Sequence, residues 1–128
     1  MKKAIILAGA LLLTVALQAG PFPEITIDQL KSAIASKEVT LLDVNGSRSW
    51  KEGHIPGAID YAAKQAKLAS VLPKDKNALI VAYCGGPACG AYAKAAKAAK
   101  ELGYTNVKHL TAGISGWKAA GERTASGS

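Results

Sequence analysis

Two continuous apolar runs of strand length lie at residues 39–44 and 78–83, and residues 107–111 form a third predicted strand. Apolar runs of this length without polar alternation are typical of parallel strands covered on both faces. Residues 59–61 indicate a further short strand. The pattern therefore predicts a central, mainly parallel sheet.

Helix-compatible segments lie between these runs. Thr26 and Gln29 have the spacing of a capping box, which predicts a helix as far as about Ser36. Its inward positions are Leu30, Ala33 and Ile34. Further helices are expected at residues 62–72, 90–102 and 114–120, with a helical turn at 47–52. Strands that alternate with helices predict an α/β fold, in which ligands bind beyond the carboxyl ends of the strands.

The first twenty residues have the pattern of an export signal. Lys2 and Lys3 precede the apolar stretch 4–17, and Gln18-Ala19-Gly20 offers small residues for cleavage. The stretch is shorter than the about 20 residues that span a bilayer, although an uncleaved anchor is the alternative. We expect a signal peptide at residues 1–19, one domain at 20–123 and a flexible tail at 124–128. The mature protein would be periplasmic or secreted, with no stable membrane insertion after cleavage.

Composition and charge exclude some partners. The length of 128 residues suits one domain. Without Lys2 and Lys3, 14 Lys and Arg stand against 9 Asp and Glu, a net charge of +5. The lysines are scattered with few aromatic residues between them, so nucleic acid is not expected as a partner, whereas an anion or an acidic protein is. No Cys and His cluster has zinc spacing, and we expect no metal and no other cofactor.

Cys84 directly follows the second apolar run and precedes a glycine-rich loop and a helix. The first N–H groups of a helix lack partners within it and favour negative charge nearby. Gly85 and Gly86 allow the backbone to turn further amides inward. We therefore predict a nucleophilic Cys84 thiol with a lowered pKa. The alternative is an unreactive cysteine, buried as a small apolar side chain.

Four segments resemble, in order, the landmarks of rhodanese domains. They are Leu42-Asp43-Val44, Gly53-His54-Ile55-Pro56-Gly57-Ala58, Tyr83-Cys84 with its loop, and Ala112-Gly113-Ile114-Ser115-Gly116-Trp117. The resemblance covers residues 24–121 and implies the rhodanese fold, a three-layer α/β/α sandwich. It also implies a sulfurtransferase that moves sulfane sulfur, as a Cys84 persulfide, from polysulfide, thiosulfate or a persulfide to a thiophilic acceptor. The partners would be a small sulfur-containing anion and an acceptor thiol or exported protein.

The resemblance assigns site residues by position. Cys84 matches the nucleophile. The loop whose amides would face the sulfur comprises Gly85, Gly86, Pro87, Ala88 and Cys89. Asp43, His54 and Trp117 match positions for which we expect structural support, with His54 in a loop hydrogen bond rather than in catalysis.

Three positions depart from related patterns. Asn45 stands where many family members carry arginine, and Cys89 where many carry arginine or a hydroxyl residue. The loop therefore has no charged side chain, which argues against thiosulfate as the natural donor. Gly90 stands where the related cysteine phosphatases need arginine, so hydrolysis of phosphate esters is not expected.

The second cysteine leaves three roles open. Cys89 could resolve a Cys84 persulfide or sulfenate by forming a disulfide, could form a permanent disulfide that silences Cys84, or could be a passive small residue. A bridge requires the two Cα atoms to lie within about 7 Å. Two further functions stay open for the whole chain: a non-catalytic sulfur carrier or binding module, and a thiol–disulfide redox protein that uses both cysteines.

Overall fold

The computed structural model describes residues 22–127, and the predicted signal peptide lies outside this range. Within it, four strands form an all-parallel sheet with the order β2-β1-β3-β4. The strands are β1 (Val39–Asp43), β2 (Ile59–Asp60), β3 (Leu79–Tyr83) and β4 (Val107–His109). Each predicted strand segment thus contains a strand, and the α/β class with a parallel sheet is confirmed.

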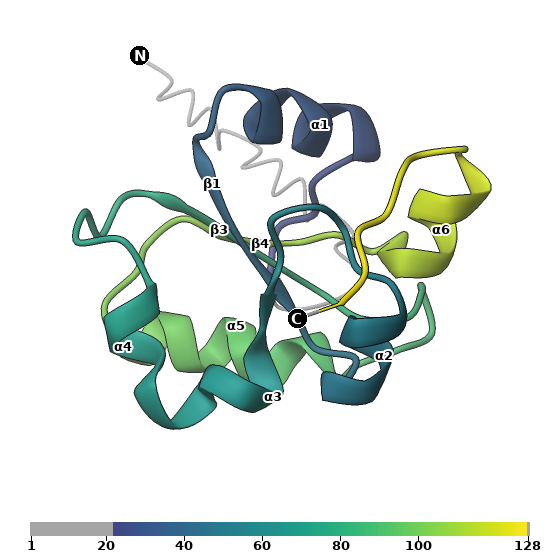
Figure 1. Ribbon diagram of the computed structural model, residues 1–128. Coiled ribbons are helices and arrows are strands. Elements are labelled where there is room, and N and C mark those ends of the chain that lie inside the picture. The colour runs from purple at the N-terminus through teal and green to yellow at the C-terminus, as the bar shows by residue number, and fades with distance from the viewer. Residues whose placement is uncertain (1–21, 128) are drawn as a thin grey trace, which may run out of the picture.

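Helices cover both faces of the sheet (Figure 1). α1 and α6 pack on one face, whereas α3, α4 and α5 pack on the other. The helical segments are α1 (Ile27–Ala35), α2 (Ser47–Glu52), α3 (Tyr61–Lys64), the 3-10 turn η1 (Gln65–Lys67), α4 (Leu68–Val71), α5 (Tyr92–Glu101) and α6 (Gly113–Ala119). Within residues 22–127, no helix has the length and apolar composition that crossing a bilayer requires.

Local sequence signals set some of these elements and not others. The capping box is present, because Thr26 Oγ1 accepts from the Gln29 amide and the Gln29 side chain accepts from the Thr26 amide, both at 3.0 Å. The segment 62–72, by contrast, is not one helix but several short pieces. Residues 62–67 are all exposed, so they offer no apolar stripe that could hold a continuous helix against the sheet.

Alternate positions of β3 face opposite helix layers, as the pleat of a strand requires. Ile80 and Ala82 belong to the core on the α5 side, whereas Val81 and Tyr83 belong to the core on the α1 and α6 side. Cys84 continues this alternation and joins the α5 side. The strand therefore decides which face of the sheet carries the sulfur.

The C-terminal segment runs back along the domain, which differs from the flexible tail expected at residues 124–128. Ala125 and His54 exchange two backbone hydrogen bonds of 2.8 and 2.9 Å. The Gly127 amide donates to the Lys51 carbonyl at 2.8 Å. Because both partners lie far away in the sequence, the small and polar residues 124–127 carry no local signal of these contacts.

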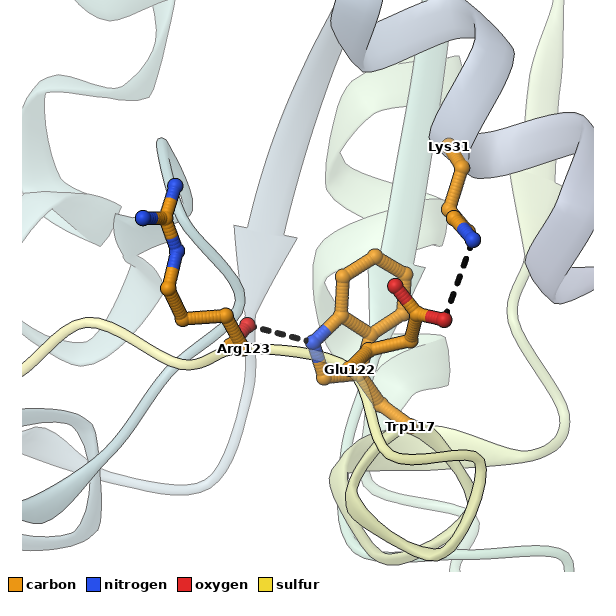
Figure 2. A network of polar contacts seen from close by, with 4 residues as sticks. All are labelled: Lys31, Trp117, Glu122 and Arg123. Atoms are coloured by element: carbon orange, nitrogen blue, oxygen red, sulfur yellow. Dashed lines mark hydrogen bonds and ion pairs between the residues drawn. The ribbon is translucent and has the colours of Figure 1, made fainter.

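Two side-chain contacts hold the start of this segment (Figure 2). Trp117 Nε1 donates to the Arg123 carbonyl at 2.8 Å, and Lys31 Nζ pairs with Glu122 at 3.0 Å. The ion pair is partly exposed and contributes little by itself. The buried Trp117 ring is the stronger anchor, since it joins the segment to the core beneath α1 and α6.

Candidate functional site

Cys84 lies at the carboxyl end of β3, where the chain leaves the sheet and turns toward α5. Its side chain is 1% exposed and belongs to the same core cluster as Leu42, Ala82 and Tyr92. Burial of this kind suits an unreactive cysteine as well as a shielded nucleophile. The direction of the surrounding backbone donors bears on the choice between these two interpretations.

Amides at the start of α6 donate hydrogen bonds to carbonyl groups of Cys84 and the loop that follows it. The Ile114 amide donates to the Cys84 carbonyl and the Ser115 amide to the Gly85 carbonyl, both at 2.9 Å. In a trans peptide the N–H group points opposite to the C=O group, so the amides of Gly85 and Gly86 point away from α6. That direction is toward the side of the sheet on which the Cys84 side chain lies.

Several amides around this loop have no hydrogen-bond acceptor among the described residues. They include those of Gly85, Gly86 and Ala88, and those of residues 90–92 at the start of α5. The Cys89 amide differs, because it donates to the Gly86 carbonyl at 3.0 Å and closes a turn inside the loop. Unpartnered amides on the side of the loop where a cysteine lies can serve as donors to an anion. In the bridged chain, Cys84 Sγ itself lies 3.4 Å from the Cys89 carbonyl oxygen. The geometry therefore suits a negatively charged sulfur at position 84.

The two cysteines are joined in a disulfide in this structure. Their Cα atoms are 6.3 Å apart, inside the range of about 4.4–6.8 Å usual for such bridges. Cys89 is half-buried, and Pro87 and Ala88 between the cysteines are exposed. The loop thus folds back far enough for Cys89 to reach Cys84. This arrangement suits the resolving and the permanent-bridge roles considered for Cys89 and not the passive one.

The loop and α6 can meet because residue 113 is a glycine. Its φ is +62°, and a Cβ atom there would lie 2.6 Å from the Gly85 carbonyl carbon and 2.6 Å from the Gly86 nitrogen. A side chain at this position would push α6 and the loop apart. The sequence contains Gly113 in one of the rhodanese-like segments, but its contact with the loop is visible only in three dimensions.

A buried hydrogen-bonded chain fastens the strand ends beside the loop. Asp43 and Tyr83 are register partners in β1 and β3, and Tyr83 Oη donates to Asp43 Oδ2 at 2.6 Å. Tyr83 Oη also accepts from the Ile55 amide at 3.0 Å, and the Asn45 amide donates to Asp43 Oδ1 at 2.8 Å. Tyr83 is the centre of this chain, and sequence reasoning treated it only as part of an apolar run. The chain fixes the end of β3 from which Cys84 extends.

Burial controls the protonation of this pair. It raises the pKa of Asp43 above the ordinary value of 3.8, against the opposing effect of hydrogen bonds from Tyr83 and Asn45. Burial and the neighbouring Asp43 also raise the pKa of Tyr83, so its hydroxyl stays protonated and able to donate. The charged form of the Asp43 carboxyl is therefore less favourable in the folded chain than in water.

This shift predicts a pH dependence of stability. Because the pKa of Asp43 is raised, the folded chain binds more protons than the unfolded chain just above pH 3.8, and stability falls as pH rises through that window. The Asp43→Asn variant lacks this titration. The wild type should therefore be most stable relative to this variant at pH 3.8 and below, and its relative stability should fall as pH rises through the raised pKa. Urea unfolding under reducing conditions measures this relative stability, and a relative stability that rises with pH would contradict the assignment.

His54 and Trp117 bond to backbone carbonyls away from the cysteine loop. His54 Nδ1 lies 2.6 Å from the Trp50 carbonyl oxygen, and its ring stacks on Trp50 with the centroids 4.1 Å apart. Trp117 bonds to the C-terminal segment (Figure 2). Within residues 22–127, no three His, Cys, Asp or Glu side chains gather in a way that could hold a metal ion. The groups that the fold brings to Cys84 are Cys89 and the amides of the loop.

Fold and site together define an α/β/α protein with a cysteine loop at the carboxyl end of a central parallel strand. The chain belongs to the family of the rhodanese-like domain, whose model matches residues 26–120. The resemblance noted in the sequence is thereby confirmed at the level of the family.

Two similar proteins and one similar crystal structure agree with this family assignment. The HTH-type transcriptional regulator Rv0324 of Mycobacterium tuberculosis is 37% identical over 102 residues, which cover 79% of this chain but only 44% of the regulator. The thiosulfate sulfurtransferase GlpE of Pseudoalteromonas translucida is 29% identical over 102 residues, or 77% of this chain and 91% of that enzyme. The crystal structure of the BH2092 protein from Bacillus halodurans has 28% identity and a TM-score of 0.64, and the match covers 82% of this chain and 77% of that one.

Proposed function

We propose that this chain is a sulfurtransferase in which Cys84 carries sulfane sulfur as a persulfide. The observation that carries the proposal is the set of unpartnered amides at Gly85, Gly86 and Ala88, on a loop whose carbonyls are held by α6. The similarity to a thiosulfate sulfurtransferase along nearly all of that enzyme's length supports it.

The proposed reaction has two steps at one sulfur atom. The Cys84 thiolate attacks the sulfane sulfur of the donor, the donor's S–S bond breaks, and sulfite, a thiol or a shorter polysulfide leaves. The new outer sulfur on Cys84 carries the negative charge, which the amides of Gly85 and Gly86 stabilise. An acceptor thiolate or cyanide then takes the outer sulfur and restores the Cys84 thiolate.

The loop also narrows the class of donor. Residues 85–89 contain no charged side chain, so amides alone would hold the donor. This composition favours an organic persulfide, whose persulfide group carries a single charge, over the doubly charged thiosulfate. The acceptor is a small thiol or the thiol of another protein.

An exported location forms part of the proposal. Residues 1–20 have the composition of a signal peptide. A Cys84–Cys89 disulfide persists in oxidising compartments such as the periplasm, whereas the cytosol keeps thiols reduced.

A second candidate function is thiol–disulfide exchange by Cys84 and Cys89, and the bridge between them favours it. This function needs no sulfur donor, since the bridged chain would oxidise a substrate dithiol directly. The two candidates therefore differ in whether a sulfane donor is consumed.

Donor cleavage by the reduced and the bridged protein tests the proposal. The reduced chain should release sulfite from thiosulfate, or the thiol from an organic persulfide, whereas the bridged chain should release neither because Cys84 is blocked. Both products are measured in a single turnover with the reductant removed. If the reduced chain cleaves no donor, the sulfurtransferase proposal is wrong; if the bridged chain cleaves donors equally, Cys84 is not the nucleophile.

A further inference from the structure

The Cys84–Cys89 disulfide places a second sulfur within bonding reach of the proposed persulfide carrier. The Cα atoms are 6.3 Å apart across a loop of a few residues, a separation that a disulfide can span. A reduced Cys89 therefore stands beside Cys84 as an internal thiol. A nucleophile held in this way reacts at an effective concentration far above that of a free thiol in solution.

We propose that Cys89 is the internal acceptor, whose thiolate attacks Sγ of the Cys84 persulfide, closes the observed disulfide and expels sulfide. The proposal deepens the sulfurtransferase function and rests on it. The overall reaction of the chain is then the reduction of sulfane sulfur to sulfide, with a dithiol as the reductant. Cys89 is then a catalytic residue rather than a part of the loop alone.

The step balances in atoms and electrons. The outer sulfur of the anionic persulfide, Cys84–S–S⁻, first takes the proton of the Cys89 thiol. The resulting Cys89 thiolate and Cys84–S–SH then give the Cys84–Cys89 disulfide and HS⁻. The bond between Cys84 Sγ and the outer sulfur breaks, and its electron pair leaves with the outer sulfur. The two cysteine sulfurs are oxidised together by two electrons, which the outer sulfur gains.

Access at the site favours attack from within. Cys89 already contacts Cys84 Sγ in the bridged chain, so the internal thiol needs no path from solvent to that atom, whereas an external thiol must first enter the loop. The unpartnered amides of Gly85, Gly86 and Ala88 stabilise the departing sulfide, as they stabilise the persulfide. The amides of residues 90–92 do the same for the Cys89 thiolate before it attacks.

The two cysteines differ in exposure, and this difference determines which sulfur a reductant attacks when it reduces the disulfide. Cys89 is half-buried, whereas Cys84 is almost fully buried. A dithiol reductant therefore attacks Cys89 Sγ and forms a mixed disulfide there, and Cys84 leaves as the thiolate next to the loop amides. The second thiol of the reductant then releases Cys89. The cycle ends with Cys84 ready for the next donor.

The test follows the two steps separately in one sample. The full chain is reduced, freed of reductant and mixed with one equivalent of thiosulfate, or in parallel with an organic persulfide. Sulfite or the released thiol reports donor cleavage, and sulfide reports the attack by Cys89. The wild type should release one sulfide per donor cleaved, lose both of its thiols and retain no added sulfur.

Cys89→Ser and Cys89→Ala are the matched variants. Each should still cleave the donor, release no sulfide without an added thiol, and gain the mass of one sulfur atom. Cys84→Ala should do neither step. The wild-type protein is the control for donor cleavage, since Cys89 belongs to the loop that holds the donor.

The possible results separate the two proposals. A wild type that cleaves the donor and keeps the sulfur, with no sulfide released, overturns the role of Cys89 and leaves the sulfurtransferase function standing. No donor cleavage by any of the proteins means that the sulfurtransferase function itself has failed. Because the thiol count and the sulfide yield of the wild type already decide the point, a variant that does not fold leaves the proposal falsifiable.

Discussion

Replacing Gly113 by alanine will both destabilise the fold and disable the cysteine loop. The new Cβ would lie 2.6 Å from backbone atoms of Gly85 and Gly86. Because these are backbone atoms, the clash cannot be relieved by a side chain that moves aside. The clash should cost about 1–3 kcal/mol, and alanine at a φ of +62° should add about 1–2 kcal/mol. Since α6 holds the carbonyls of the loop, a displaced α6 also turns the amides of Gly85 and Gly86 away from Cys84. Donor cleavage should fall by about 100-fold, the scale that a 1 Å displacement can produce.

Gly121 provides the matched control at the other end of the same helix. Its φ is +79°, but a Cβ there would meet nothing within 4 Å. Gly121→Ala should therefore show only the backbone strain of about 1–2 kcal/mol and keep its donor cleavage. Urea unfolding of the reduced proteins and single-turnover rates measure both effects. Equal stability and equal rates for the two variants would mean that the contact between α6 and the loop does not matter.

The strands and the first helix could be predicted because their signals are local. The apolar runs at 39–44 and 78–83 contain β1 and β3, since a strand covered on both faces needs apolar residues at nearly every position. Thr26 and Gln29 mark the start of α1 because the capping contacts join residues only three positions apart.

The parts that sequence reasoning missed depend on contacts between distant segments. Tyr83 reads as one more apolar strand residue, and only the register of β1 with β3 shows that its hydroxyl meets Asp43. The course of residues 124–127 depends on pairing with His54, about seventy positions earlier in the chain. No pattern within either segment reports its partner.

The cysteine loop could be predicted from the sequence only in part. The order of strand, Cys84, glycines and helix predicted where a reactive sulfur could lie. It left the role of Cys89 open, because a short span between two cysteines permits a bridge but does not require one. The direction of the amides was also beyond local signals, since it follows from hydrogen bonds between α6 and the carbonyls of Cys84 and Gly85.

Replacing Cys84 by alanine will abolish sulfur transfer while leaving the fold largely intact. Its side chain is small and buried in an apolar cluster, so its truncation should cost about 1–2 kcal/mol. No other thiol can substitute for it: Cys89 is the second cysteine of the chain, and it lies beyond the end of β3 rather than at it. Donor cleavage should fall to the rate measured without protein, whereas the reduced variant should remain folded and lose only this stability in urea unfolding.

The central claim is that the loop amides allow Cys84 to hold an anionic sulfur, and a mass measurement tests it most directly. The reduced Cys89→Ala chain, which cannot form the disulfide, is mixed with thiosulfate or an organic persulfide and compared with the Cys84→Ala chain. The account predicts a gain of one sulfur atom on the peptide that contains Cys84, and no gain on the Cys84→Ala chain. A Cys89→Ala chain that takes up no sulfur, or equal uptake by both chains, would contradict it.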